Sequence, residues 1–242
     1  MLKSFSIILI SLVLASCAQK PPSSTVTLLD GYRTRGAAHA MLGSYGRKTG
    51  KVQFGYERVD VPKWKSVALK KVAVVDITEE KKRELENAGV SFGTAGQVTA
   101  SASSSENASY KIVFMEILSL AALRNELREL IKKDPDVKKD LIDKDARIVI
   151  TSGVVLDHET ARQVSASLDA NASLANVTGS PVIRFKGSAS STKTLKIGDQ
   201  TVVAYQYARL CWEHGELRAL VRDSTSADLS ACPNGSSRTF PG

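Results

Sequence analysis

The sequence has few of the residues that most often carry out chemistry. Its 242 residues include three histidines and three cysteines, and 6% of them are aromatic. It contains no P-loop, no glycine-rich dinucleotide fingerprint and no Gly-x-Ser-x-Gly nucleophile motif. The sequence therefore has the motif of none of these enzyme classes, and neither a cofactor nor a metal ion is expected to bind.

Apolar stretches long enough to span a membrane are missing as well. The apolar stretch over residues 5–14 has about half of the roughly 20 residues that a membrane-spanning helix needs. Lys3 precedes it, and small residues follow it up to Cys17. A charged start, a short apolar stretch and a small-residue processing site are typical of a signal peptide. Residues 1–16 are therefore expected to be cleaved and not to join the fold.

The tetrapeptide LASC at residues 14–17 resembles the lipobox of bacterial lipoproteins. The resemblance covers residues 1–17 alone. It implies that the Cys17 thiol receives a diacylglycerol and that this residue, with acyl chains such as palmitate, becomes the new N-terminus. Ala18 implies the outer membrane of a Gram-negative envelope, facing the periplasm or the cell surface, although a Gram-positive host would remove that step. The alternative is cleavage near Cys17 by the general signal peptidase.

The other two cysteines, Cys211 and Cys232, are expected to form a disulfide. An even number of cysteines in an oxidising compartment is most simply explained by pairing. In the chain-entropy model, closing a loop of this length stabilises the fold by about 3 kcal/mol. Two free thiols are the alternative. A metal site is not expected, because no histidine lies at a zinc-like spacing from them.

Positive charge is concentrated in residues 31–71, within a chain of net charge +8. This segment has ten basic residues and two acidic ones. A basic segment close to an anionic membrane gains about 1 kcal/mol per charge. Anionic lipid or lipopolysaccharide is therefore an expected partner, and the alternative is a solvated basic face. The expected contact residues are Arg33, Arg35, Arg47, Lys48 and Lys51. Nucleic acid is not expected, because no binding motif is present.

Hydropathy patterns predict an α+β fold, in which helices pack on one face of an antiparallel sheet made of hairpins. The expected organisation is a signal peptide at 1–16, a lipid-anchored tether at 17–30, a basic membrane-proximal segment at 31–71, an α+β domain at 72–234 and a flexible tail at 235–242.

Two helices are predicted from their caps and apolar stripes. Thr78 is a suitable N-cap for a helix that Gly89 ends. A second helix follows from Leu123, whose apolar neighbours recur along one face until Asp134-Pro135.

Strands are predicted from runs of β-branched residues and from alternation. These segments are 71–77, 97–103, 110–120, 146–156, 164–174, 182–188 and 202–210. Residues 164–174 alternate without exception, and Gly198-Asp199 has the composition of a two-residue hairpin turn. Residues 146–210 are therefore predicted to form an antiparallel meander.

Three titratable residues stand out as candidates for chemistry. Glu116 lies in a predicted central strand, where a carboxylate needs a partner such as Lys111 or Arg147. His158 and His214 have acidic neighbours but no metal-binding spacing. An ion pair at Glu116 and polar turns at the histidines are the favoured interpretations, so no catalytic residue is assigned.

These observations favour a lipid-anchored, non-enzymatic binding or assembly protein of the cell envelope, with an unidentified envelope protein as partner. An envelope hydrolase is one alternative. A pore former that inserts hairpins at 97–120 and 162–188 is another, because eleven alternating residues can span a membrane as a strand. Against it, the apolar face of 164–174 is half alanine and has no aromatic girdle.

Overall fold

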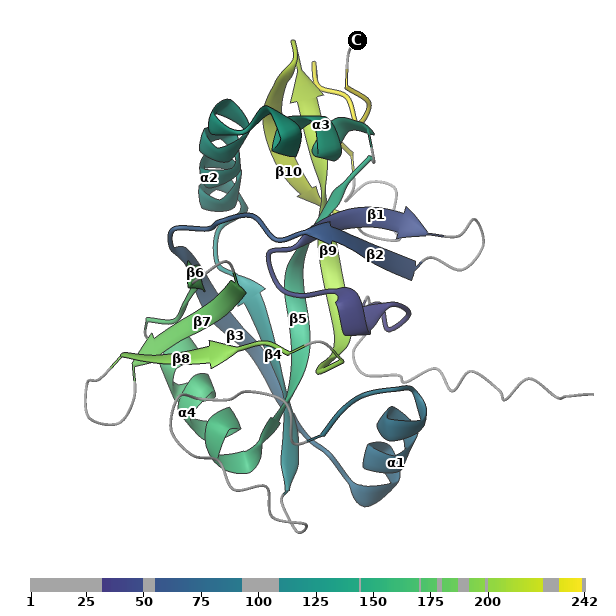
Figure 1. The fold of residues 1–242 in the computed structure, drawn as a ribbon, viewed down its shortest axis with the longest axis vertical. Helices are drawn as coiled ribbons and strands as arrows, with labels where there is room; N and C mark the ends of the chain where they lie inside the picture. The colour runs from purple at the N-terminus through teal and green to yellow at the C-terminus, as the bar shows by residue number, and fades with distance from the viewer. Residues whose placement is uncertain are drawn as a thin grey trace, which may run out of the picture.

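The computed structural model shows a curled, mostly antiparallel sheet with helices packed against it (Figure 1). The described residues are 32–49, 55–92, 109–143, 145–169, 171–177, 180–186, 192–198, 200–223 and 231–240. Within them, the strands are β1 (Tyr45–Thr49), β2 (Gly55–Asp60), β3 (Val67–Asp76), β4 (Tyr110–Ile117), β5 (Arg147–Asp157), β6 (Ser173–Val177), β7 (Ser180–Lys186), β8 (Thr192–Lys196), β9 (Val202–Glu213) and β10 (Glu216–Arg222). The helices are the 3-10 helix η1 (Ala37–His39), α1 (Glu79–Asn87), α2 (Leu120–Lys133), α3 (Pro135–Asp143) and α4 (His158–Leu168).

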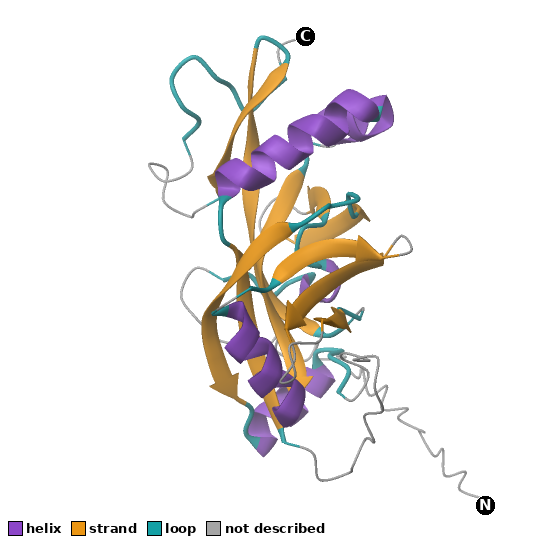
Figure 2. Ribbon diagram, turned by 90° about the vertical axis from the view of Figure 1, so that its left-hand side faces the viewer, coloured by secondary structure: helices purple, strands orange, loops and turns teal. Residues whose placement is uncertain are grey.

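The sheet has the strand order β10-β9-β5-β4-β3-β6-β7-β8. β1 lies off this path, because it pairs with β2 and with the first residues of β5. The β1–β2 hairpin therefore branches from the middle of the sheet (Figure 1). β3 and β6 share two residue pairs, so the sheet is narrowest where it continues into β7 and β8. Figure 2 shows that the strands of the sheet are strongly twisted.

Helices cover both faces of this sheet, whereas the sequence led us to expect helices on one face only. Successive side chains of a strand point to opposite faces, and β4 shows the consequence. Its Val113 belongs to the larger apolar cluster, together with Leu123 of α2 and Val164 of α4. Its Phe114 belongs to a second cluster, together with Leu85 of α1. A central strand that is apolar on both sides needs cover on both sides, which explains the correction.

The first predicted helix begins and ends where its caps indicate, and the second ends at the predicted Asp134 but begins at Leu120, before the predicted Leu123. The Thr78 hydroxyl oxygen accepts a hydrogen bond from the backbone N–H of Lys81 at 3.2 Å. Gly89 follows the helix with a φ of 84°, a conformation that glycine adopts without strain. Asp134 ends α2, and Pro135 is the first residue of α3. Local signals were sufficient for these elements.

The strand predicted over residues 164–174 is wrong in its first half, which belongs to α4. The buried helix residues Ala161, Val164 and Leu168 are three and four positions apart and form one stripe against the sheet. Asp157 caps the helix, because its carboxylate accepts a hydrogen bond from the backbone N–H three residues later at 2.9 Å. Alternating alanine and serine fits both periods, so the alternation did not distinguish a strand from a helix.

The hairpin predicted at Gly198-Asp199 is also wrong. β8 pairs with β7, whereas β9 lies between β5 and β10. The predicted meander over 146–210 is therefore interrupted by α4, and its β6–β7–β8 portion lies at the far end of the sheet (Figure 1). A turn signal specifies a local reversal but not the pairing of strands, and β9 is apolar enough on both faces to need a central position. The strand predicted at 97–103 lies outside the described residues.

The segment before residue 72 is continuous with the rest of the sheet. The expected boundary at residue 72 falls inside β3, and the backbone of Arg33 forms two hydrogen bonds of 2.9 Å with Tyr205 of β9. The N-terminal basic segment thus contributes β1, β2 and part of β3 to the fold.

The C-terminal segment is fastened to the end of β9. Cys211 and Cys232 form the expected disulfide, with their Cα atoms 5.7 Å apart. Backbone hydrogen bonds of 2.7 and 2.8 Å join Trp212 to Ser237. The ring of Phe240 lies 5.2 Å from that of Trp212 in an edge-on contact. Residues up to 240 therefore pack on the domain, within the segment expected to be a flexible tail.

Candidate anion-binding site

Four basic side chains gather around a buried carboxylate where β1 meets β5. They come from segments far apart in the sequence, and we call them together the basic cluster. Its members are Arg33, Lys48 of β1, Arg147 of β5 and Arg209 of β9, with Asp223 after β10 as the carboxylate and Tyr207 of β9 beside it. Because β5 and β9 are central strands, these charges lie over the middle of the sheet and not on a free edge.

Strand register brings the cationic residues together. Arg147 and Arg209 are direct partners on β5 and β9, and Gly46 of β1 is the partner of Arg147 on the other side. Directly opposed residues point to the same face, and Lys48 shares the face of Gly46 because it is two residues further on. Like charges in opposed positions destabilise a sheet unless anionic groups compensate them.

Asp223 is the main compensating group. Its side chain is 1% exposed. Its Oδ1 atom lies 2.6 Å from Nη2 of Arg209, and its Oδ2 atom lies 3.8 Å from Nη2 of Arg33. A carboxylate buried this deeply is tolerated only when cations replace the water that it has lost. These ion pairs link Arg33, near the start of the described chain, and Arg209 of β9 to Asp223, which follows β10.

Tyr207 forms the apolar wall of the cluster. The guanidinium carbon of Arg33 lies 4.7 Å from the centre of the Tyr207 ring, in a cation–π contact. Burial raises the pKa of Tyr207 to about 12; Arg33 opposes this shift and Asp223 reinforces it. The hydroxyl is therefore protonated at neutral pH and able to donate a hydrogen bond.

The cluster has more positive than negative charge. Arg147 donates to both carboxylate oxygens of Asp145, at 2.7 and 2.9 Å. Burial lowers the pKa of the Lys48 amine; Asp223 counteracts this effect, whereas the three neighbouring arginines add to it. Among the described residues, these four cations therefore lie close to one another, with the carboxylates of Asp145 and Asp223 beside them.

Two hydrogen-bond donors of the cluster remain unused. The Nε–H groups of Arg147 and Arg209 are buried and have no acceptor within the part of the chain that the structure describes. Leaving a buried donor unsatisfied costs about 1–3 kcal/mol. These two donors belong to residues that are directly opposed on β5 and β9.

The structure separates the basic residues that the sequence grouped together. Arg33 and Lys48 join the basic cluster. Arg47 points away from it and forms an ion pair with Glu57 at 2.7 Å, with both side chains more than half exposed. The carbonyl oxygen of Arg35 accepts a hydrogen bond from a buried tyrosine. The remaining predicted contact residue, Lys51, lies outside the described residues.

Glu116 is paired, as predicted, but not with the predicted residues. Its carboxylate, 9% exposed, forms ion pairs with Lys70 of β3 and Arg222 of β10. The expected partners are engaged elsewhere: Lys111 pairs with Asp76, and Arg147 pairs with Asp145. Cross-strand register decides this outcome, because Lys70 lies directly opposite Glu116.

The histidine candidates occupy structural positions. His158 is the exposed first residue of α4, next to the N-cap. His214 and Gly215 have φ values of 47° and 78° and connect β9 to β10 as a two-residue turn with both φ angles positive, which is the conformation of a type I′ hairpin. The described residues contain no group of three or more side chains placed to hold a metal ion.

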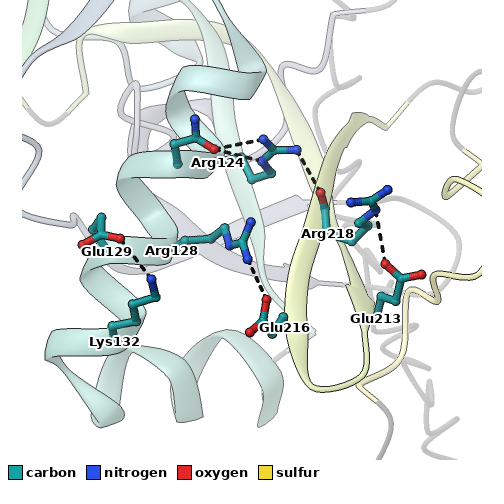
Figure 3. Close-up of polar contacts among 8 residues, drawn as sticks. Arg124, Arg128, Glu129, Lys132, Glu213, Glu216 and Arg218 are labelled. Atoms are coloured by element: carbon teal, nitrogen blue, oxygen red, sulfur yellow. Dashed lines mark hydrogen bonds and ion pairs between the residues drawn. The ribbon is translucent and has the colours of Figure 1, made fainter.

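A shallow groove lies between α2 and the β9–β10 hairpin, and its charged residues are paired (Figure 3). Arg128 of α2 donates to Glu216 at 2.6 Å, and Arg218 contacts Glu213 at 3.2 Å. Arg124 donates to the backbone carbonyl of Arg218 at 3.1 Å. The two arginines and two glutamates that line the groove balance one another in charge, and Arg124 beside it contacts neutral groups.

Two members of the cluster, Arg209 and Asp223, were missed in the sequence, and Arg147 was considered only as a partner for Glu116. A signal existed for the two arginines, because each interrupts an apolar strand, as Glu116 does. Asp223 had no such signal, since it directly follows β10 among polar residues. Only the strand order reveals that the three converge.

Searches for relatives give no further guidance. No protein-family model, no curated protein and no solved structure matches this chain. In the part of the chain that the structure describes, no helix is long and apolar enough to cross a membrane.

Proposed function

We propose that this protein is a lipid-anchored, non-enzymatic binding component of the bacterial cell envelope, held at the membrane through Cys17 and contacting an anionic surface with its basic cluster. The observation that carries the proposal is the convergence of Arg33 and Lys48 with two arginines from distant strands. The first described residue, Tyr32, is fifteen positions from Cys17 (32 minus 17). An extended chain of that length reaches at most about 50 Å, so the anchor keeps the cluster near the membrane.

A lipid anchor and a basic patch complement each other in this proposal. The anchor fixes the domain at the membrane, and the patch orients it by attraction to anionic headgroups. The disulfide is consistent with an oxidising compartment such as the periplasm. The partner that we favour is anionic lipid or lipopolysaccharide, with an envelope protein bound elsewhere on the domain.

Two measurements test the proposal separately. Replacing Cys17 with Ser should abolish incorporation of labelled fatty acid and release the domain from membranes, and unchanged acylation would show that the lipobox assignment is wrong. The mature chain carrying Cys17→Ser should float with vesicles that contain an anionic phospholipid and not with neutral vesicles. Equal recovery from both kinds of vesicle would contradict the role of charge.

A pore former remains a second candidate that the strand pattern suggested. Of the two hairpins expected to insert, residues 162–188 include the end of α4, and only β6 and β7 within them form a hairpin. The described part of 97–120 contains β4, a central strand between β3 and β5. Dye leakage from liposomes tests this candidate, and intact liposomes at high protein concentration would exclude it.

A further inference from the structure

Two short segments cover edges of β9, and each forms one isolated β-bridge with it. The backbone of Arg33 bonds to that of Tyr205 through two hydrogen bonds of 2.9 Å. The backbone of Ser237 bonds to that of Trp212 through hydrogen bonds of 2.7 and 2.8 Å. The first segment continues into the sheet, whereas the second is joined to β9 by the disulfide. We call this second segment, residues 231–240, the C-terminal strap (Figure 1).

The C-terminal strap lies on a part of β9 that β5 does not reach. The pairing of β5 with β9 begins at Arg147 and Arg209, so residues 210–213 of β9 extend beyond it. Within them, Trp212 directs its backbone N–H and C=O groups to the strap. A strand edge whose N–H and C=O groups are free is a template for pairing with another chain. The strap therefore occupies an edge that an extended segment can pair with.

An aromatic contact covers the apolar side of the same edge. The ring of Phe240 lies 5.2 Å from that of Trp212, and the Lys138 amine of α3 lies 5.3 Å from the centre of the Phe240 ring. Trp212 is 3% exposed, and Phe240 is half-buried against the main apolar cluster. Removing the strap would thus uncover a tryptophan side chain together with two backbone groups.

The non-covalent attachment of the strap is weak compared with the cost of ordering it. Seven of its ten residues are exposed, so their side chains recover little of the conformational entropy that ordering removes. The hydrogen bond from the backbone N–H of Ser236 to the carbonyl of Pro233 closes a turn within the strap and does not join it to β9. The disulfide between Cys211 and Cys232 is therefore the main attachment, because it holds the strap beside its edge when the other contacts open.

We propose that the C-terminal strap is a redox-controlled cover. Reduction of the disulfide between Cys211 and Cys232 by a dithiol releases the strap and exposes Trp212 with the edge of β9. This device goes beyond the proposed function and depends neither on the lipid anchor nor on the basic cluster. The uncovered edge is open to pairing with an extended chain, and it is closed as long as the disulfide is intact.

The reduction needs two electrons, which the dithiol supplies. Cys232 is the more accessible half of the disulfide, because it is half-buried and Cys211 is fully buried. A thiolate of the reductant attacks the Cys232 sulfur, the bond between the two cysteine sulfurs breaks, and the Cys211 sulfur leaves as a thiolate and takes up a proton. The second thiolate of the reductant then attacks its partner sulfur in the mixed disulfide, and Cys232 leaves as a thiolate and is protonated. The products are two cysteine thiols and the disulfide form of the reductant.

Amide hydrogen exchange tests the release, with the second bridge of β9 as an internal control. The mature Cys17→Ser chain is compared with and without dithiothreitol, and exchange of the Trp212 and Tyr205 amides is followed by NMR. Without the cross-link, opening of the strap becomes about 100-fold more frequent, as expected for a loop of this length, so exchange at Trp212 should accelerate by that factor. The Tyr205 amide bonds to Arg33 and not to the strap, so its rate should not change.

Acceleration at Trp212 alone would support the proposal. Unchanged exchange at Trp212 after reduction would overturn it, because the strap would then stay in place without the disulfide. Equal acceleration of both amides would overturn it too, since the disulfide would then stabilise the whole domain and not the strap alone. None of these results affects the proposed contact with an anionic surface.

A double variant, Cys211→Ala with Cys232→Ala, gives a second test without a reductant. Acrylamide quenching of tryptophan fluorescence reports on Trp212, because the other tryptophan, Trp64, is buried and donates to the carbonyl of Gly43. We expect one of the two tryptophans to become accessible to the quencher in the double variant and in the reduced wild type. Quenching equal to that of the oxidised wild type in both would refute the release of the strap.

Discussion

Two buried carboxylates, Glu116 and Asp223, lie on opposite faces of the sheet, and each is held by two cations. Asp223 is enclosed by Arg33 and Arg209, which are 21% and 15% exposed. Glu116 is held by Lys70 and Arg222, which are both 45% exposed. The carboxylates are equally dependent on partners, but the partners differ in access to water. The cations beside Glu116 have access to water and can be rehydrated if the carboxylate is removed. The cations beside Asp223 are mostly buried, so they depend on the carboxylate more strongly.

The surroundings differ as well. Around Glu116, neutral side chains continue the row across the sheet: Thr151 is its cross-strand partner, and Gln206 accepts a hydrogen bond from Arg222 at 3.1 Å. Around Asp223, further cations are present, namely Lys48 and Arg147. The first row therefore continues with neutral groups, whereas the second continues with cations. This difference is the reason why the proposed function places binding on the Asp223 side and leaves a structural role to the Glu116 side.

The largest effect is expected for Asp223→Asn, which removes the carboxylate from between two mostly buried guanidinium groups. Breaking a buried ion pair by removing one partner costs about 3–5 kcal/mol of unfolding free energy, because the remaining charges are uncompensated. Urea unfolding monitored by tryptophan fluorescence measures this loss. Asp145→Asn is the matched control, since the Asp145 side chain is 70% exposed, and a loss of similar size there would show that burial is not the cause.

A smaller effect is expected for Glu116→Gln. Its two cations are nearly half exposed and can be rehydrated when the carboxylate is gone, so we expect a loss of about 1–3 kcal/mol in the same unfolding measurement. Gln preserves the shape and most of the packing in the strand. A loss equal to that of Asp223→Asn would erase the distinction between the two sides.

The tyrosines of the Asp223 side should make stability depend on alkaline pH. The folded pKa of Tyr207 is raised to about 12, so the unfolded state releases this proton near pH 10 and the folded state retains it longer. The contribution of Tyr207 to stability is complete below pH 10 and falls as the pH rises toward 12. Tyr207→Phe should therefore lose less stability than the wild type between pH 9 and pH 11, measured by chemical unfolding. Parallel curves would contradict this assignment.

The smallest effect is expected for Arg47→Gln. The ion pair with Glu57 is exposed on both sides, and such pairs contribute little to stability. No measurable change in the unfolding midpoint is expected. A clear decrease would mean that charges at the surface of this hairpin matter more than burial predicts.

Parts of this fold followed from local sequence signals, and other parts did not. The caps at Thr78 and Gly89 and the pairing of Cys211 with Cys232 were readable because each depends on a few neighbouring residues or on simple counting. The helix α4 was not readable, because its small residues alternate with the period of a strand while its buried residues follow the period of a helix.

The basic cluster could be predicted only in part, for a related reason. The excess of positive charge in residues 31–71 pointed to Arg33 and Lys48, but their neighbours come from β5, β9 and the end of β10. That convergence depends on the strand order, and the order depends on which strands need cover on both faces. Long-range pairing of this kind leaves no mark in a local pattern.

The most direct test of the assignment compares one lysine from each side of the sheet. Lys48→Gln and Lys70→Gln are introduced separately into the mature Cys17→Ser chain, and flotation with anionic vesicles is measured at several salt concentrations. Both substitutions remove one positive charge from a partly exposed side chain. We expect Lys48→Gln to weaken flotation and Lys70→Gln to leave it near the wild-type level. Equal weakening by both, or a larger loss in Lys70→Gln, would contradict the assignment of binding to the Asp223 side.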